Sequence, residues 1–140
     1  MTEAQTALAR RVVACKGWRW LPGMRTDSKF ARVVTVDSDS DVACAAEEGA
    51  SEDDCHAVWL DRVRVLPDLT DPATLGCLLA LVRDAWGNPN GHIVFLGKCG
   101  SDPRGWRFEW STTDGQFGGG IHRYSPTEAE ALVVALEGAP

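Results

Sequence analysis

The apolar residues of three segments recur at helical spacing. The strongest pattern spans 72–86, where five apolar side chains share one helical face: Leu75, Leu78, Leu79, Val82 and Trp86. Asp71 suits the N-cap of this helix, and Gly87 suits the position after its last turn. Similar spacing predicts a helix over 3–15. A capping-box pattern at 125–128 predicts the start of a third helix, which ends at Gly138.

Alternation of apolar and polar residues predicts the strands. In 105–111, three aromatic residues alternate with Arg107 and Glu109. Further strands are predicted at 18–20, 30–36, 57–66, 92–98 and 117–124, and the last three strands of the chain are expected to form an antiparallel meander. This order of elements favours an α+β domain. We expect one antiparallel sheet of about five to six strands, with three helices packed on one face.

One segment, 37–54, fits neither pattern. It holds eight acidic residues and no basic one: Asp37, Asp39, Asp41, Glu47, Glu48, Glu52, Asp53 and Asp54. Because the whole chain has a formal net charge of −6 and this acidic tract carries −8, the other residues sum to +2. Ala, Ser and Gly separate the acids, which predicts a flexible, solvated loop at 37–55. A surface that imitates nucleic-acid phosphates is the alternative interpretation.

Length and composition predict a single domain over 1–140. A chain of 140 residues can bury a core without a metal or a disulfide. The five cysteines are odd in number and scattered, and no signal-peptide pattern is present, which favours reduced thiols in the cytoplasm. No apolar run of about 18 residues occurs, so no membrane partner is expected.

The residue types of metal and thiol chemistry are present, but their spacing is poor. The only close pair of metal ligands is Cys55 and His56, and adjacent residues rarely reach the same ion. We therefore expect no metal and no cofactor. A thiol enzyme built on Cys99 and His122 stays open as an alternative. Gly118 to Gly120 suit a strand better than a phosphate cradle, because no helix follows them directly.

Nucleic-acid binding has mixed support. Residues 1–36 hold two acids and seven basic residues: Arg10, Arg11, Lys16, Arg19, Arg25, Lys29 and Arg32. Trp18 and Trp20 flank Arg19, and aromatic residues among cations suit the stacking of single-stranded bases. The sequence pI of about 5.0 argues against direct nucleic-acid binding. We favour pairing of this basic segment with the acidic tract of the same molecule.

Three blocks of the sequence resemble a known group of proteins. They are RVLPDLTDPATLGCLLALVRDAW at 64–86, GWRWLPGM near the N-terminus and SPTEAEALVVALE near the C-terminus. These blocks resemble segments of small uncharacterised accessory proteins that phages and prophages encode. The resemblance implies a phage or prophage product that acts in the cytoplasm of a bacterial host. It carries over no catalytic residue, and it does not include the acidic tract.

The sequence as a whole favours a non-enzymatic protein that binds another protein. One specific hypothesis is an inhibitor of a bacterial defence complex, similar to an anti-CRISPR protein, because blocking a basic nucleic-acid channel needs only a complementary surface. A nucleic-acid-associated phage factor is the alternative. The oligomeric state is left open. The candidate partner-binding residues are Asp37, Asp39, Asp41, Glu47, Glu48, Asp53, Asp54, Trp18, Arg19 and Trp20.

Overall fold

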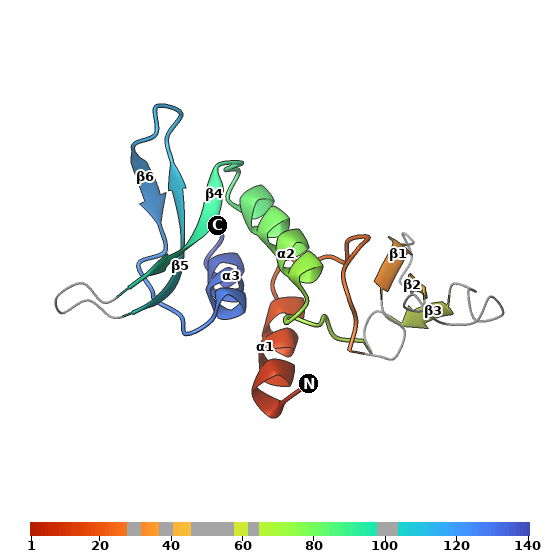
Figure 1. Ribbon diagram of the computed structural model, residues 1–140. Coiled ribbons are helices and arrows are strands. Elements are labelled where there is room, and N and C mark those ends of the chain that lie inside the picture. Colours follow the sequence, from red (N-terminus) through yellow and green to blue (C-terminus); the bar gives the residue numbers. More distant parts are fainter. Residues whose placement is uncertain (28–31, 37–40, 46–57, 62–64, 98–103) are drawn as a thin grey trace. The chain divides into compact units, whose positions relative to one another are not determined.

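The protein is described by a computed structural model that covers all residues except 28–31, 37–40, 46–57, 62–64 and 98–103 (Figure 1). The chain divides into two compact units. Unit 1 contains Met1–Val13 and Arg19–Cys77, and unit 2 contains Ala14–Trp18 and Leu78–Pro140. The expectation of one domain over 1–140 stays a prediction.

Unit 1 combines a helix with a three-stranded antiparallel sheet. The helix α1 spans Glu3–Val13, and its residues Ala9 and Val12 are buried. The sheet has the order β1-β2-β3, with β1 at Arg32–Val36, β2 at Asp41–Ala45 and β3 at Val58–Asp61. The central strand β2 therefore pairs with a neighbour on each side.

Strand β2 corrects the predicted loop at 37–55. Asp41–Ala45 lies inside that range, yet it forms the centre of a sheet. The prediction rested on the charge of the tract and overlooked the short uncharged run from Val42 to Ala45. Pairing with a strand on each side holds this run extended. Residues 37–40 and 46–55 lie outside the described residues.

The other early strand predictions are confirmed only in part. The segment 18–20 forms no strand, because no described strand pairs with it. The chain instead turns directly afterwards, where the N–H of Met24 donates to the carbonyl of Leu21. Gly23 adopts a φ of 95° in this turn, a conformation that favours glycine. Strands β1 and β3 lie within the predicted ranges 30–36 and 57–66.

Unit 2 contains the predicted meander. The strands β4 at Gly91–Leu96, β5 at Gly105–Ser111 and β6 at Phe117–Gly120 pair antiparallel in the order β4-β5-β6. Helix α3, Glu128–Glu137, packs against β5 and β4 (Figure 1). All six residues from Ala131 to Leu136 are buried.

The α+β class is confirmed, with three helices among the described residues. The single sheet of five to six strands is wrong, because the described strands form two separate three-stranded sheets. Alternation within a strand identifies the strand but not its partner, so the sequence pattern could not separate one sheet from two.

Helix α2, Pro72–Ala85, begins and ends where its sequence predicts. Asp71 caps its N-terminus by accepting the N–H of Thr74 at 2.8 Å. At the C-terminus, the N–H groups of Gly87 and Asn88 donate to the carbonyls of Asp84 and Arg83. These two bonds form a Schellman motif, which needs the positive φ of 59° that Gly87 adopts.

Candidate interaction surface

The two faces of the sheet in unit 2 differ in chemistry. Trp86 packs at 6.3 Å from Phe108 and 5.3 Å from Trp110, measured between ring centroids, and its indole N–H donates to the carbonyl of Ala135 in α3. The even-numbered residues of β5 therefore face the core. Since side chains alternate along a strand, Arg107 and Glu109 project from the opposite, outer face.

We call the polar and aromatic side chains of this face the outer-face cluster. Its members are His92, Arg107, Glu109, Phe117 and Tyr124. The register supports the grouping, because His92 of β4 is opposite Glu109 of β5, and Phe117 of β6 is opposite Ser111 of β5.

Arg107 is the centre of the outer-face cluster. Its Nε and Nη2 donate to Oε2 of Glu109 at 3.0 and 2.7 Å, and its Nη1 is 3.4 Å from the hydroxyl of Tyr124. The guanidinium carbon lies 5.9 Å from the ring centroid of Phe117 and 5.7 Å from that of Tyr124. A guanidinium held by a carboxylate and two rings keeps a fixed orientation, so this part of the surface is preorganised.

His92 extends the row of contacts onto β4. Its Nδ1 is 2.9 Å from the carbonyl oxygen of Asn90, and its Nε2 is 3.7 Å from Oε1 of Glu109. Because a carbonyl oxygen can only accept, Nδ1 carries a proton in this contact. Glu109 thus contacts both Arg107 of its own strand and His92 of β4, so the cluster extends across two strands.

Phe117 is the exposed part of the cluster. Its relative exposure is 57%, and the ring of His122 lies 6.3 Å away. Aromatic residues and arginine are enriched at the centres of protein interfaces. An exposed phenylalanine with a fixed arginine beside it is therefore the feature of unit 2 that best suits partner binding.

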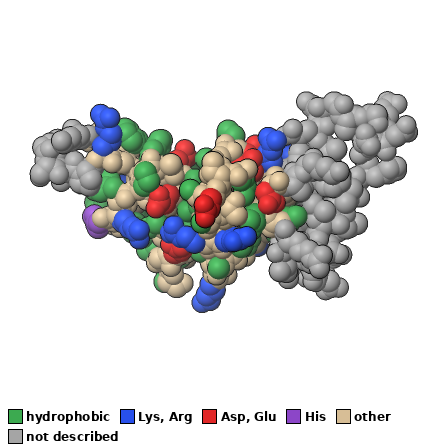
Figure 2. All heavy atoms as spheres, turned by 90° about the horizontal axis from the view of Figure 1, so that it is seen from below, with side chains coloured by type: hydrophobic (Ala, Val, Ile, Leu, Met, Phe, Trp, Pro, Cys, Tyr) green, Lys and Arg blue, Asp and Glu red, His purple; other side chains and the backbone are tan. Residues whose placement is uncertain are grey.

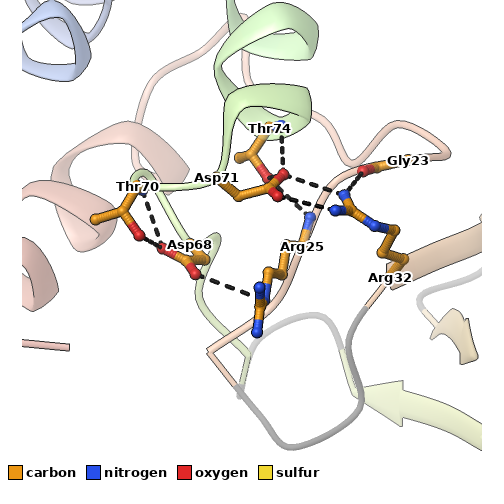
Figure 3. A network of polar contacts seen from close by, with 7 residues as sticks. All are labelled: Gly23, Arg25, Arg32, Asp68, Thr70, Asp71 and Thr74. Carbon is orange, nitrogen blue, oxygen red and sulfur yellow. Dashed lines mark hydrogen bonds and ion pairs between the residues drawn. The ribbon is translucent and has the colours of Figure 1, made fainter. Parts of the chain in front are cut away.

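Unit 1 contains a different polar cluster, at the start of α2 (Figure 3). Arg32 donates from Nη1 and Nη2 to the two carboxylate oxygens of Asp71 at 3.1 and 3.0 Å, and from Nη1 also to the carbonyl of Gly23. Thr74 donates its hydroxyl to Asp71 and accepts the N–H of Arg25 at 2.8 Å. These groups satisfy one another, so the cluster stabilises the fold and leaves no reactive group.

The pKa of Asp71 reflects this arrangement. Burial alone would raise it, but the hydrogen bonds from Arg32 and Thr74 outweigh burial and hold the pKa below its ordinary value. Asp71 is therefore ionised under ordinary conditions and acts as a structural anion.

The structure describes few of the predicted acidic binding residues. Asp41 is the first residue of β2, and its partner in the register is Asp61 of β3. The remaining acidic candidates lie outside the described residues: Asp37, Asp39, Glu47, Glu48, Asp53 and Asp54. Their role in binding stays a prediction.

The three predicted residues at 18–20 do not form an exposed aromatic strand. Trp20 is only 5% exposed, Trp18 is half-buried, and Arg19 is exposed. A buried indole cannot stack on a base from solvent. The predicted stacking surface of Trp18, Arg19 and Trp20 is therefore wrong for Trp20.

Two cations of the basic segment pair with acids outside the acidic tract. Arg25 lies 3.7 Å from Asp68, and Arg32 lies 3.0 Å from Asp71. Both acids lie between the tract and α2 in the sequence. Pairing of the basic segment with the tract itself stays a prediction, because most of the tract lies outside the described residues.

Charges of both signs are mixed on the visible surface. Figure 2 shows basic side chains beside acidic ones on this face of the described residues.

The described residues bear only in part on the metal and thiol chemistry considered from the sequence. No group of three or more His, Cys, Asp or Glu side chains there could hold a metal ion. Neither Cys15 nor Cys77 forms a disulfide, and Cys55, His56 and Cys99 lie outside the described residues. Burial raises the pKa of the Cys77 thiol, with a smaller effect of Asp71, so this thiol is a poor nucleophile.

The glycine run 118–120 has a packing role. A Cβ at Gly118 or Gly119 would lie 2.7 or 2.5 Å from atoms of the Trp110 ring. Gly119 also adopts a φ of 154°. Close contact with an indole explains Gly118 and Gly119. The strand prediction at 117–124 is confirmed only for Phe117–Gly120.

Among the described residues, no helix is both long enough and apolar enough to cross a lipid bilayer.

The sequence predicted part of the outer-face cluster. Alternation in 105–111 correctly opposed Arg107 and Glu109 to the core aromatics. Phe117 and Tyr124 were missed as site residues, because their proximity to Arg107 depends on the pairing of β6 with β5 and on the chain that follows it. The only signal in the sequence was one aromatic residue at each end of the glycine-rich segment 117–124.

Comparisons with known proteins give no relative: no protein-family model, no curated protein and no solved structure matches the chain.

Proposed function

We propose that this protein acts by binding another protein and not by catalysis. The exposed ring of Phe117, held beside the fixed guanidinium of Arg107, is the observation that carries the proposal. A preorganised aromatic and arginine surface loses little side-chain entropy on binding, which favours affinity. The resemblance of the three sequence blocks to phage proteins suggests the setting: a phage or prophage accessory protein in the bacterial cytoplasm.

The specific form of the proposal is an inhibitor of a bacterial defence complex, similar to an anti-CRISPR protein. The acidic tract supports this form, because eight acids in 37–54 would attract a basic nucleic-acid-binding partner and raise the rate of association. In this scheme the tract steers the partner, and the outer-face cluster supplies contact energy.

The test is affinity capture from a bacterial host lysate with the wild-type protein and two variants. Phe117→Ala removes the exposed ring, and Gln116→Ala changes the adjacent exposed residue as the matched control. We expect at least one captured protein to fall by about tenfold or more with Phe117→Ala, as truncation of an interface hot spot would cause. The same protein should be retained by Gln116→Ala. Equal capture by all three proteins would contradict the role of the cluster.

A nucleic-acid-associated factor is the second candidate, favoured by one observation. The guanidinium of Arg107 lies over two rings, Phe117 and Tyr124, and such aromatic and cationic surfaces also stack single-stranded bases. Fluorescence anisotropy with single-stranded DNA and RNA separates the candidates. Binding that weakens steeply with salt and is lost in Phe117→Ala would favour this second function.

A further inference from the structure

Strand β4 is an edge of the sheet in unit 2. In the order β4-β5-β6, the described strands give β4 a partner on one side only. Its register with β5 is continuous over all six residues from Gly91 to Leu96, with no bulge. The sequence GHIVFL contains no Lys, Arg, Asp, Glu or Pro. Edge strands normally carry such protective features, because an unprotected edge pairs readily with another strand.

The direction of the backbone groups in β4 follows from the hydrogen bonds of β5. Trp106 exchanges backbone hydrogen bonds with Ser125, and Phe108 accepts the N–H of Ile121, so the even residues of β5 point away from β4. The odd residues of β5 therefore face β4. Arg107 is opposite Val94 and Glu109 is opposite His92, so these even residues of β4 bond to β5.

The odd residues of β4 consequently direct their N–H and C=O groups away from the sheet. Gly91 agrees with this assignment, because its carbonyl accepts Nε of Arg83 at 2.6 Å and its N–H donates to Asn88. The outward groups of Ile93 and Phe95 have no such partner among the described residues. Phe95 is also 50% exposed, although its strand is apolar. An edge of this kind fits the backbone of another strand.

The spacing of these groups is self-complementary. A two-fold axis through Val94, perpendicular to the sheet, places Ile93 of one copy opposite Phe95 of the other, and Phe95 of the first copy opposite Ile93 of the second. In an antiparallel ladder, such opposite pairs exchange both hydrogen bonds, which gives four bonds in total. Ile93 and Phe95 lie on the same face of the sheet, so each exposed ring packs on a β-branched side chain of the other copy. No charged side chain of β4 opposes this approach.

We infer that this protein forms a homodimer in which the β4 strands of two copies pair antiparallel about Val94. The two three-stranded sheets then join into one continuous sheet of six strands. The interface is the backbone edge of β4, whereas the outer-face cluster includes only the His92 side chain of this strand. This inference therefore does not depend on the proposed function.

The first test measures molar mass as a function of concentration, by sedimentation equilibrium. We expect wild-type protein to approach twice the monomer mass of 15.2 kDa. Phe95→Lys places a charge at the edge, and Ile93→Pro removes an outward N–H without touching the bonds to β5; both should remain monomeric. Ser111→Lys is the matched control. It places the same charge on the central strand β5, away from the β4 edge, and should still dimerise.

A second measurement resolves the edge residue by residue. In hydrogen exchange followed by NMR, the amides of Ile93 and Phe95 should become protected as the concentration rises. The amides of His92 and Val94 should be protected at every concentration, since they bond to β5. The latter pair also reports whether each variant is folded.

Two outcomes would overturn the inference. One is a wild-type protein that stays monomeric over the whole concentration range, with exchange at Ile93 and Phe95 unchanged. The other is a dimer that persists in both Phe95→Lys and Ile93→Pro, which would place the contact between copies elsewhere on the surface.

Discussion

At the scale of single residues, Asp71 joins several polar contacts within unit 1. Its carboxylate accepts from the backbone and hydroxyl of Thr74 and from two nitrogens of Arg32, which fixes β1 relative to the start of α2 (Figure 3). The side chain of Asp71 is 5% exposed, whereas that of Arg32 is 43% exposed. Screening by solvent therefore limits the strength of the ion pair, and the N-cap contributes a separate share.

We predict that Asp71→Asn lowers the free energy of unfolding at neutral pH by about 1 kcal/mol. Asparagine can still cap α2, so the loss isolates the charge. Because folding lowers the pKa of Asp71, the stabilisation is present above the ordinary aspartate value of about 3.9 and is lost as the pH falls through the folded pKa. The difference between wild type and variant should thus shrink below about pH 4, as urea unfolding across pH can measure.

Asp68→Asn is the control for this experiment. It removes the longer ion pair with Arg25, at 3.7 Å, from the same cluster. We expect a smaller loss of stability at neutral pH. A loss as large as that of Asp71→Asn would show that the local negative charge matters and the geometry at Asp71 does not.

At the scale of elements, α2 shows how local sequence sets the ends of a helix. One glycine within the helix and one just after it have opposite effects on it. Gly76 lies within the helix, is exposed, and has open space where a Cβ would be; Gly87 follows the helix with a φ of 59°. The first glycine weakens the helix, and the second is needed to end it.

The same substitution should therefore have opposite effects at these two positions. Gly76→Ala is expected to raise the free energy of unfolding by up to about 1 kcal/mol, because alanine has the higher helix propensity. Gly87→Ala is expected to lower it by about 1 kcal/mol, because a Cβ strains a left-handed residue. Urea denaturation of both variants checks the pair. Stabilisation by both changes would mean that α2 does not end in a Schellman motif.

Strands show the limit of local sequence more clearly than helices do. The alternation in 105–111 identified β5 with its correct faces, since a strand with one buried face must alternate. The aromatic pair Trp18 and Trp20 alternates equally well but forms no strand, because no described strand lies beside it to pair. Asp41–Ala45 shows the reverse case. Its acidic surroundings predict a loop, but pairing with β1 and β3 makes it a strand.

At the scale of the whole molecule, one segment supplies both the acidic tract and a strand of the fold. The tract at 37–54 carries eight of the 20 acidic residues, and it also contains β2, which joins β1 to β3. Deleting the tract therefore tests two properties together, whereas neutralising its acids outside β2 tests the charge alone.

We predict that deletion of 38–53 disrupts the sheet of unit 1, because the remaining strands lose their central partner. A variant with Asp39→Asn, Glu47→Gln, Glu48→Gln and Asp53→Asn makes the formal net charge of −6 less negative by four and should keep the fold. Circular dichroism with thermal unfolding compares the two. A deletion variant that unfolds like wild type would show that β2 is dispensable.

The local elements and the chemistry available to them follow from the sequence alone. The periodicity of α2, its caps at Asp71 and Gly87, and the faces of β5 follow from neighbours along the chain, where the physical preferences are short-range. The prediction of an α+β protein rests on the same local signals. The tertiary structure alone decided how these pieces meet. It split the described strands into two sheets, placed β2 within the acidic tract, buried Trp20 and set Phe117 beside Arg107. Each of these outcomes depends on pairing between residues distant in sequence, and hydrophobic pattern and charge do not specify the partner.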